Sequence, residues 1–370
     1  MPTVTARIGP FELSPNLTIK QVGIDDNVFN ETTNPKRDFV IGVSPELTVF
    51  SRMGLTQFAA STITDFTHYA KYDSERSFTR TLRGRFDLNL SRFRPSIAGA
   101  ANSSRERPND EIDTRARCSE TEASGRVGFD LSPLAQIYGG VARVGIDYQQ
   151  GETFRGVDLD QSLNRRLEQA QAGVRLSLTP LTTLVVDATV ARDRFVTASG
   201  RDSVSRTAAT ELIFGNDAII RGRVKVGFED FRPEDPTLVP YKGLVTEAAL
   251  SFRGFWLGRF DGSISRQIHY SYDENEGYYV GTGGQVRYTQ RVVGPLDVQV
   301  VYGASRQDYG RRIGLFGGTD NTHMYGGGIG LNRDMGSRFG INYEYRNRDA
   351  RDAAESYARR RVFASYTYLY

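Results

Sequence analysis

The chain contains very little cysteine, tryptophan and histidine. Its 370 residues include one Cys, one Trp and three His. The single cysteine, Cys118, excludes a disulfide framework and a thiolate metal site. The histidines, His68, His269 and His323, occur in no HExxH or other ligand spacing, so a zinc site or a catalytic dyad has little support. We therefore expect no metal, no cofactor and no enzymatic activity.

Long hydrophobic runs are also missing. No apolar stretch approaches the roughly 20 residues of a transmembrane helix, and 25% of the residues are charged. The net charge is only +3, from 47 basic and 44 acidic residues without a block of one sign, so we expect no nucleic-acid partner. A membrane role must therefore come from strands, whose alternation hides apolar surface from an average over the sequence.

Alternation of apolar and polar residues is the main feature that is present. Each alternating segment has about the 9–11 residues that a tilted strand needs to cross a bilayer. Charged residues inside every segment argue against the core of a β-sandwich and favour a barrel with a wet lumen. The clearest examples are 38–50, 81–91, 169–178, 218–229 and 338–346.

The segments number about eighteen, although sixteen is also compatible with the sequence. Short connections alternate with longer polar ones, as in outer-membrane barrels with short periplasmic turns and longer extracellular loops. We therefore predict one all-β domain over 1–370, an antiparallel transmembrane β-barrel, with 1–12 as a periplasmic lead-in. The expected strands are 13–24, 38–50, 55–69, 79–92, 95–104, 116–131, 135–149, 163–178, 182–195, 203–214, 217–230, 241–253, 256–271, 277–291, 295–308, 321–333, 337–349 and 356–370.

Aromatic residues gather near both ends of the expected strands, which predicts two girdles at the membrane interfaces. The alternative is that Tyr and Phe are simply common in strands. Near the long loops lie Phe66, Tyr69, Tyr148, Phe228, Tyr270, Tyr278, Tyr302 and Tyr345, and near the short turns lie Phe50, Phe129, Phe214, Phe252, Trp256 and Tyr370.

The last strand ends on an aromatic residue at the final position. Ala364, Tyr366, Tyr368 and Tyr370 share one face, and such a face suits lipid better than water. This ending resembles the C-terminal signature of bacterial outer-membrane barrels, with Tyr in place of the usual Phe. The resemblance implies that Tyr366, Tyr368 and Tyr370 form a signal for the barrel-assembly machinery.

Charged residues on the expected inner faces are the candidate pore lining. Two interpretations remain open: they brace the wall through ion pairs, or they guide an anionic or sugar-rich solute. The candidates are Arg83, Arg85, Asp87, Arg126, Arg143, Arg175, Arg221, Arg223, Lys225, Arg259, Arg287, Arg338, Glu344, Arg359 and Arg361.

One arginine conflicts with this assignment. Arg266 falls on the face expected to meet lipid. A bulge or register shift near Gly262 would resolve the conflict, and it would also change the inner face beyond that point.

A motif near the N-terminus carries a family resemblance. Gly23-Ile24-Asp25-Asp26-Asn27-Val28-Phe29 ends one expected strand, and Val43-Ser44-Pro45-Glu46-Leu47 lies in the next. Together they resemble the opening of the putative β-barrel porin 2 family, whose barrels are often encoded with exopolysaccharide synthesis and export genes. The resemblance implies a polysaccharide secretion channel. For Asp25, Asp26 and Asn27 three roles remain open: an Asx turn, a cation site, or contact with the exported polymer.

The leading hypothesis is a non-catalytic outer-membrane channel for secretion of an exopolysaccharide. No connection clearly exceeds about 13 residues, so we expect no long loop folded into the lumen, which favours an export pore over a diffusion porin. The alternatives are a general or anion-preferring porin, and an outer-membrane enzyme or adhesin. Expected partners are outer-membrane lipid, lipopolysaccharide, the polysaccharide and a periplasmic export protein. Met1–Arg7 lacks the apolar core of a signal peptide. Two interpretations are open: a mature form with an added start Met, or a protein that never leaves the cytoplasm. The barrel pattern favours the first.

Overall fold

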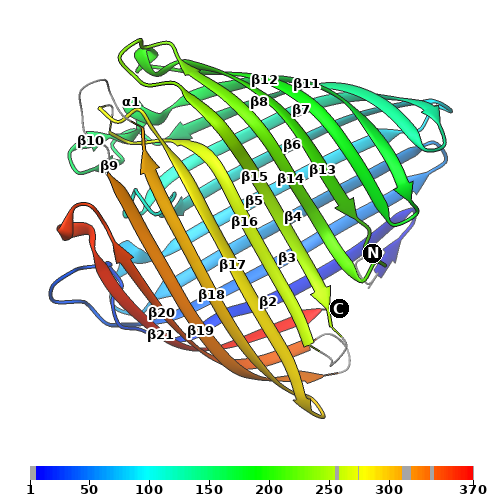
Figure 1. The fold of residues 1–370 in the computed structure, drawn as a ribbon. Coiled ribbons are helices and arrows are strands. Elements are labelled where there is room, and N and C mark those ends of the chain that lie inside the picture. The colour runs from blue at the N-terminus through cyan, green and yellow to red at the C-terminus, as the bar shows by residue number, and fades with distance from the viewer. Residues whose placement is uncertain (1–5, 255–257, 274, 311–317, 334–336, 370) are drawn as a thin grey trace.

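The chain forms a closed antiparallel β-barrel in the computed structural model (Figure 1). The structure describes residues 6–254, 258–273, 275–310, 318–333 and 337–369, and for Arg333, Tyr368 and Leu369 only the backbone. Each long strand pairs with the next along the chain, and the first long strand pairs with the last, from Asn16–Leu369 to Asp25–Arg361, which closes the barrel.

The described residues contain eighteen long strands, which confirms the predicted fold class and the higher of the two strand counts. They are β2 (Phe11–Asp25), β3 (Asp38–Met53), β4 (Thr56–Tyr69), β5 (Ser77–Leu88), β6 (Phe93–Glu106), β7 (Ala116–Ser132), β8 (Ala135–Tyr148), β11 (Arg165–Thr179), β12 (Thr182–Phe195), β13 (Ser203–Phe214), β14 (Ile220–Pro233), β15 (Tyr241–Arg253), β16 (Gly258–Tyr270), β17 (Tyr278–Val293), β18 (Leu296–Tyr309), β19 (Thr319–Arg333), β20 (Ser337–Asp349) and β21 (Tyr357–Leu369).

Short elements occupy the connections. None of the helices in the described part of the chain is long and apolar enough to cross a membrane. These elements are β1 (Ala6–Ile8), which pairs with the start of β2, the β9 (Thr153–Phe154) and β10 (Val157–Asp158) hairpin, α1 (Leu159–Leu163), and the 3₁₀ turns η1 (Asp73–Glu75), η2 (Ser199–Arg201) and η3 (Ala353–Glu355).

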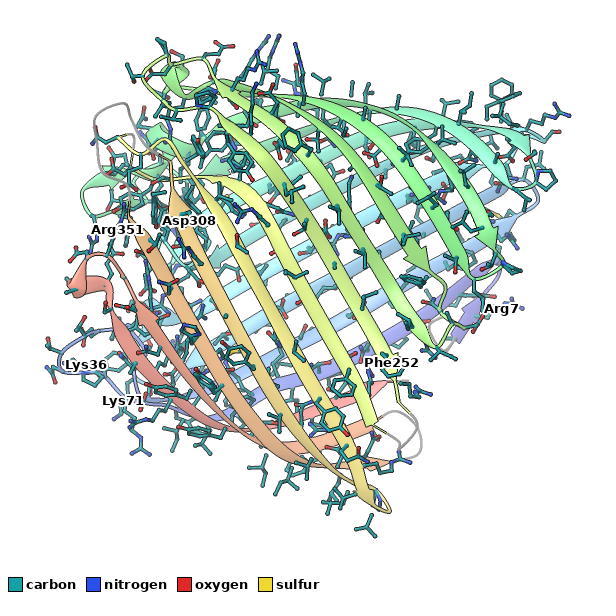
Figure 2. All side chains as sticks on the ribbon, viewed as in Figure 1. Arg7, Lys36, Lys71, Phe252, Asp308 and Arg351 are labelled. Carbon is teal, nitrogen blue, oxygen red and sulfur yellow. The ribbon has the colours of Figure 1, made fainter. Side chains whose placement is uncertain are left out.

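The two ends of the barrel differ. Short turns and both termini lie at one end, and the longer connections lie at the other (Figure 1). Figure 2 marks the long-loop end by Lys36, Lys71 and Arg351, and the short-turn end by Arg7 and Phe252. The expected strands 79–92 and 95–104 place a turn at residues 93–94, and this was wrong. The turn precedes Phe93, since the N–H groups and carbonyls of Leu90 and Phe93 bond to each other.

Side chains alternate between the two faces of the wall, as the pleat requires. In β3, Phe39 and Ile41 are 44% and 36% exposed, whereas Val40 between them is 1% exposed. The exposed apolar positions of the other strands continue this outer face around the barrel. The inner face carries most of the charged residues, so the structure has an apolar exterior and a polar lumen.

Two arginines on the outer face test the predicted assignment of side chains to the inner and outer faces. Arg143 was expected to line the pore, and this was wrong: it shares the outer face of β8 with Ile137 and Val141. Arg266 does lie on the outer face, and no bulge occurs between β16 and its two neighbours. It donates a hydrogen bond to the Thr282 hydroxyl at 2.6 Å.

β15 and β16 separate from each other near the long loops. These strands pair only from Thr246–Arg266 to Arg253–Arg259. Beyond that point the ends of β16 and β17 fold beneath their neighbours. Tyr270 and Tyr278 pack against Phe231 of β14, with ring centroids 6.1 and 5.0 Å apart, and Tyr270 also reaches Phe195 of β12 at 4.8 Å. The outer faces of the ends of β16 and β17 thus pack on the inner faces of β12 and β14.

This packing corrects the predicted girdles. Phe66, Phe228 and Tyr302 are exposed on the outer face near the long loops, as predicted, but Tyr69 and Tyr278 are buried. Tyr148 and Tyr270 also pack in interior clusters rather than facing lipid. At the other end, Phe50 lies on the inner face of β3, and Trp256 and Tyr370 lie outside the described residues. The aromatic pattern alone could not separate interface residues from those that pack inside.

Candidate functional site: the lumen and its cap

A segment of the β6–β7 connection crosses the lumen. We call residues 107–115 the crossing segment. Asp110 accepts hydrogen bonds from Ser305 of β18 at 3.1 Å and from Arg346 of β20 at 2.5 Å. Many strands separate β6 and β7 from β18 and β20 in either direction around the barrel. The contact therefore requires the segment to pass through the interior, which contradicts the expectation that no loop folds into the lumen.

Both sides of the crossing segment are anchored. Near its start, Arg107 donates to the Val28 carbonyl at 3.0 Å and forms an ion pair with Asp113 at 2.5 Å. Asp113 also accepts from the Asn30 amide at 2.8 Å. Ile112, in the middle, is fully buried. It packs with Leu159, Leu163 and Tyr272 in a cluster that joins three connections.

The tip of the β16–β17 hairpin, residues 271–273 and 275–277, also turns inward, and Figure 1 shows it beside α1. Arg201, 5% exposed, donates to the carbonyls of Ser162 and Gly277 at 2.7 and 2.8 Å and also to that of Ser271. One guanidinium thus ties the tip to the β8–β11 connection. We call the crossing segment, this tip and residues 149–164 together the cap.

Glu111 joins two parts of the cap. Its carboxyl accepts a hydrogen bond from the Ser271 hydroxyl at 2.5 Å. The whole Glu111 residue is 2% exposed. Burial raises the pKa of Glu111 from its ordinary 4.5 to about 8, because a charged carboxylate would lose its hydration there. At neutral pH the closed cap therefore holds Glu111 largely protonated.

The β20–β21 connection closes over the same end. Arg348, 2% exposed, forms ion pairs with Asp320 at 2.8 Å and Glu355 at 3.0 Å. Arg155, beside α1, reaches Glu355 at 2.7 Å and Asp352 at 3.0 Å. The cap narrows the lumen through ion pairs, hydrogen bonds and one small apolar cluster, not through a continuous sheet. Such contacts can break without unfolding the wall.

Below the cap, the inward basic residues fall into two groups. The members of the first are held by carboxylates: Arg85 by Asp87, Arg223 by Glu247, Lys225 by Asp187, Arg259 by Asp261, Arg338 by Asp297, Arg359 by Asp25 and Arg361 by Glu344. These pairs join neighbouring positions of the wall. They support the bracing interpretation for this half of the predicted set.

The second group consists of Arg83, Arg126, Arg175, Arg221 and Arg287, which face inward from β5, β7, β11, β14 and β17. In the part of the chain that the structure describes, no carboxylate forms an ion pair with any of them. Arg126 lies over the Tyr138 ring, 4.6 Å from its centroid, and Arg221 donates to the Ala218 carbonyl at 3.4 Å. These side chains are available to an anion in the lumen.

One recess in the wall is lined by more basic than acidic side chains, and it contains Arg287 of the second group. It has a volume of about 1020 Å³ and lies along β15–β21 and β2. Its basic side chains are Lys20, Arg253, Arg259, Arg287, Arg291 and Arg338, and its acidic ones are Asp261, Asp297 and Glu344, six against three. Lys20, Arg253 and Arg291 were not predicted to line the pore. Lys20 lies at a register shift in β2, and Arg253 and Arg291 lie at strand ends, where the alternation stops.

The Asp25-Asp26-Asn27 motif lies where the barrel closes. Asp25 accepts the Asn27 N–H at 3.2 Å, which is Asx-turn geometry. It is fully buried and ion-paired with Arg359 of β21, while Asp26 accepts the Arg360 N–H at 2.6 Å. No group of three or more His, Cys, Asp or Glu within the described ranges could hold a metal ion. These contacts give the motif a structural role in joining the first and last strands.

The predicted assembly signal is only partly described. Tyr366 pairs with Phe339 of β20 and lies on the outer face. The side chain of Tyr368 and the whole of Tyr370 lie outside the described residues.

Comparison with known proteins agrees with this architecture. The model of the family described as Putative beta-barrel porin 2 matches residues 2–369, and no curated protein sequence matches the chain. A BenF-like porin from Pseudomonas fluorescens Pf-5 superposes with a TM-score of 0.51 at 11% identity, over 97% of this chain and 99% of that one. OccK2 (OpdF) from Pseudomonas aeruginosa gives 0.51 at 13%, over 97% and 98%. A second OccK2 structure, in complex with glucuronate, gives 0.50 at 12%, over 96% and 97%.

The low identities make these likenesses of fold alone. Together with the family match, they identify an outer-membrane β-barrel of the porin type. The long-loop end is then extracellular and the short-turn end periplasmic. The cap lies at the extracellular mouth.

Proposed function

We propose that this chain, a member of the Putative beta-barrel porin 2 family, is an export channel for an acidic exopolysaccharide. It acts without catalysis. The observation that carries the proposal is the set of inward arginines without carboxylate partners, together with the basic recess on one side of the lumen. Guanidinium groups bind carboxylates and phosphates through paired hydrogen bonds, so they suit the acidic groups of a passing sugar chain.

The barrel has the size that such a path needs. Barrels of 16–18 strands leave an aqueous channel, and the ion pairs of the first arginine group hold the wall in shape. Single arginines spread over several strands offer successive weak sites. A polymer can move between such sites because no single one holds it tightly.

The export direction rests on the resemblance of the N-terminal motif to a family often encoded with exopolysaccharide genes. In this account synthesis and a periplasmic export protein drive the polymer from the short-turn end. The cap is the closed state, and it must open before a chain leaves. Its polar contacts are of the kind that an acidic polymer can replace, because carboxylates on the polymer compete with Asp110 for Arg346.

A second candidate is a diffusion channel for small sugar acids. The crossing segment favours it, because a segment held inside the lumen narrows the path toward the size of a monosaccharide. The OccK2 structure in complex with glucuronate shows that a barrel of similar fold has been observed with a sugar acid. The two candidates share the anion-attracting lumen and differ in whether the cap opens for a polymer.

The shared part is tested by the reversal potential of the refolded protein in a planar bilayer under a salt gradient. Arg287→Gln removes a charge from the recess, and Arg143→Gln removes one from the outer face. We expect Arg287→Gln to lower the preference for anions and Arg143→Gln to leave it unchanged. Equal effects of the two variants, or a wild type without anion preference, would overturn the proposal.

A further inference from the structure

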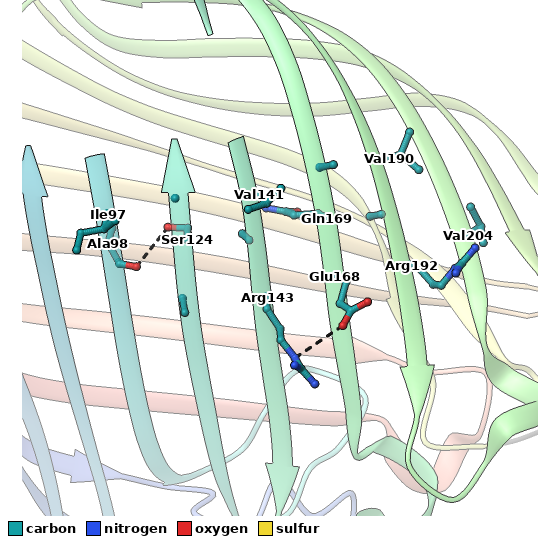
Figure 3. A pocket seen from close by; sticks show the side chains of 15 residues that line it. Ile97, Ala98, Ser124, Val141, Arg143, Glu168, Gln169, Val190, Arg192 and Val204 are labelled. Atoms are coloured by element: carbon teal, nitrogen blue, oxygen red, sulfur yellow. Dashed lines mark hydrogen bonds and ion pairs between the residues drawn. The ribbon is translucent and has the colours of Figure 1, made fainter. Parts of the chain in front are cut away.

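The outer face of the barrel carries a groove that the lumen does not explain. It runs across β6 to β13, with a volume of about 860 Å³ (Figure 3). Ile97, Val141 and Val190 border it and are 64%, 64% and 51% exposed. All three lie on one row of paired residues, with Gly125 and Ala170 between them as a low floor. This surface is apolar and hollow, and it faces the bilayer.

The character of the surface changes one row closer to the extracellular end. Arg143, Glu168 and Arg192 lie side by side in register, and Figure 3 shows them at the edge of the groove. The following row pairs Arg166 with Arg194. The row of Val190 continues through Arg206, another outward residue, to Asp230 of β14. The groove therefore runs from apolar side chains into a basic cluster.

The cluster has more arginines than its carboxylates can neutralise. Glu168 lies 3.9 Å from Arg143, and Asp147 lies 2.8 Å from Arg166. For Arg192, Arg194 and Arg206 the described residues provide no ion-pair partner. Asp230 lies opposite Arg206 in register, but it is ion-paired with Arg232 and Lys242. On the other side of the barrel, Asp308 pairs with Arg306.

An unpaired arginine on a lipid-facing wall is costly unless it reaches an anionic headgroup. At the outer boundary of an apolar band, basic clusters bind phosphate-bearing lipid headgroups. We infer that Arg192, Arg194 and Arg206 bind the phosphate groups of a lipid A-type glycolipid in the outer leaflet, while one of its acyl chains lies in the groove beside Val141 and Val190. The inference concerns the outer face and does not depend on what the lumen transports.

The site has two parts, and each makes its own demand on the ligand. The arginines require phosphate, so removing the phosphates from the lipid must weaken binding even though its acyl chains are unchanged. The acyl chain needs an empty groove, so filling the groove must weaken binding even though the arginines are unchanged. Ala170→Leu places extra volume on the floor without altering charge.

Native mass spectrometry of the refolded full chain with bisphosphorylated lipid A tests the inference. The test variant carries Arg192→Gln, Arg194→Gln and Arg206→Gln. The matched control carries Arg80→Gln, Arg266→Gln and Arg306→Gln, which removes the same charge from outward positions on β5, β16 and β18, strands that do not border the groove. At about 1 kcal/mol for each basic residue, the test variant should bind about 100-fold more weakly.

The expected result is this loss in the test variant, a change of less than about three-fold in the control, weaker binding in Ala170→Leu, and weaker binding of dephosphorylated lipid A to the wild type. Equal losses in the test and control variants would reduce the effect to general charge and overturn the site. Undiminished binding in the test variant would do the same. Heat-dependent gel mobility of every variant shows that the barrel is folded before binding is compared.

Discussion

Glu111 makes the extracellular cap sensitive to pH. Its pKa is raised to about 8 by burial in the closed cap, against an ordinary value of 4.5 when the cap is open and the carboxyl is hydrated. The closed form therefore binds more protons than the open form between these values. Its stability is complete below about pH 4.5 and falls as the pH rises toward about 8.

Single-channel recording tests whether the closed cap becomes less stable as the pH rises. We predict that the open fraction of the wild-type channel rises as the pH increases from about 5 to about 8. Glu111→Gln keeps a polar group opposite Ser271 and cannot ionise, so its open fraction should be flat over the same range. An equally steep pH dependence in the variant would show that another group controls the cap.

Asp25 illustrates a different residue-scale effect, because its partner is buried with it. Asp25→Asn leaves the Arg359 guanidinium without a countercharge at the closing seam between β2 and β21. Removing one member of a buried ion pair costs about 3–5 kcal/mol. We predict a clearly lower midpoint of denaturant unfolding.

The control is Asp65→Asn, whose ion pair with Lys20 is more exposed and is expected to contribute about 0–1 kcal/mol. If both variants unfold at the same denaturant concentration, Asp25 does not stabilise the seam in the way the structure indicates.

At the level of the elements, the crossing segment is held by few contacts at its far side. Asp110→Asn removes the ion pair with Arg346 and keeps an amide oxygen for Ser305. A hydrogen bond between charged groups contributes about 1.5–3 kcal/mol, so the balance between closed and open cap should shift roughly ten-fold or more toward open.

The measurement is the frequency of channel openings, with Asp308→Asn as the control. Asp308 forms an exposed ion pair with Arg306 on the outer face. We expect more frequent openings in Asp110→Asn and an unchanged frequency in Asp308→Asn. Unchanged openings would mean that the crossing segment does not obstruct the path.

The strands and most of their faces could be predicted from the sequence, because alternation is a local property of each strand. Arg143 shows where this reasoning failed. Ile137 and Val141 already mark its face of β8 as the outer one, and the assignment followed the charge instead of the alternation. An arginine is tolerated there because it lies near the end of the apolar band, where the cost of a charge is small.

The cap could not be predicted, because its contacts join residues far apart in the chain. The link between Asp110 and Arg346 spans 236 positions, and no local pattern reports such a link. The connection lengths were predicted only approximately, since the one between β8 and β11 runs over 149–164 instead of 150–162. In any case, length does not tell whether a loop points outward or inward. The one available signal was Ile112, an apolar residue among the charges of the crossing segment, which is fully buried in the structure.

The whole molecule is a barrel of the porin type with excess positive charge in its lumen and a cap over its outer mouth. We propose that acidic saccharides enter this lumen because of its charge. A lumen that selected by size alone would admit neutral and acidic sugars alike. Two saccharides of the same length, one acidic and one neutral, therefore separate the effect of charge from that of size.

The most direct test is single-channel conductance of the refolded protein with oligosaccharides added at the periplasmic side, comparing hexuronate oligomers with neutral oligomers of equal length. If charge selects the saccharide, the acidic oligomers block the channel, block lasts longer with increasing oligomer length, and block is weaker in Arg287→Gln. Equal block by acidic and neutral oligomers, or none by either in channels opened by Asp110→Asn, would contradict it.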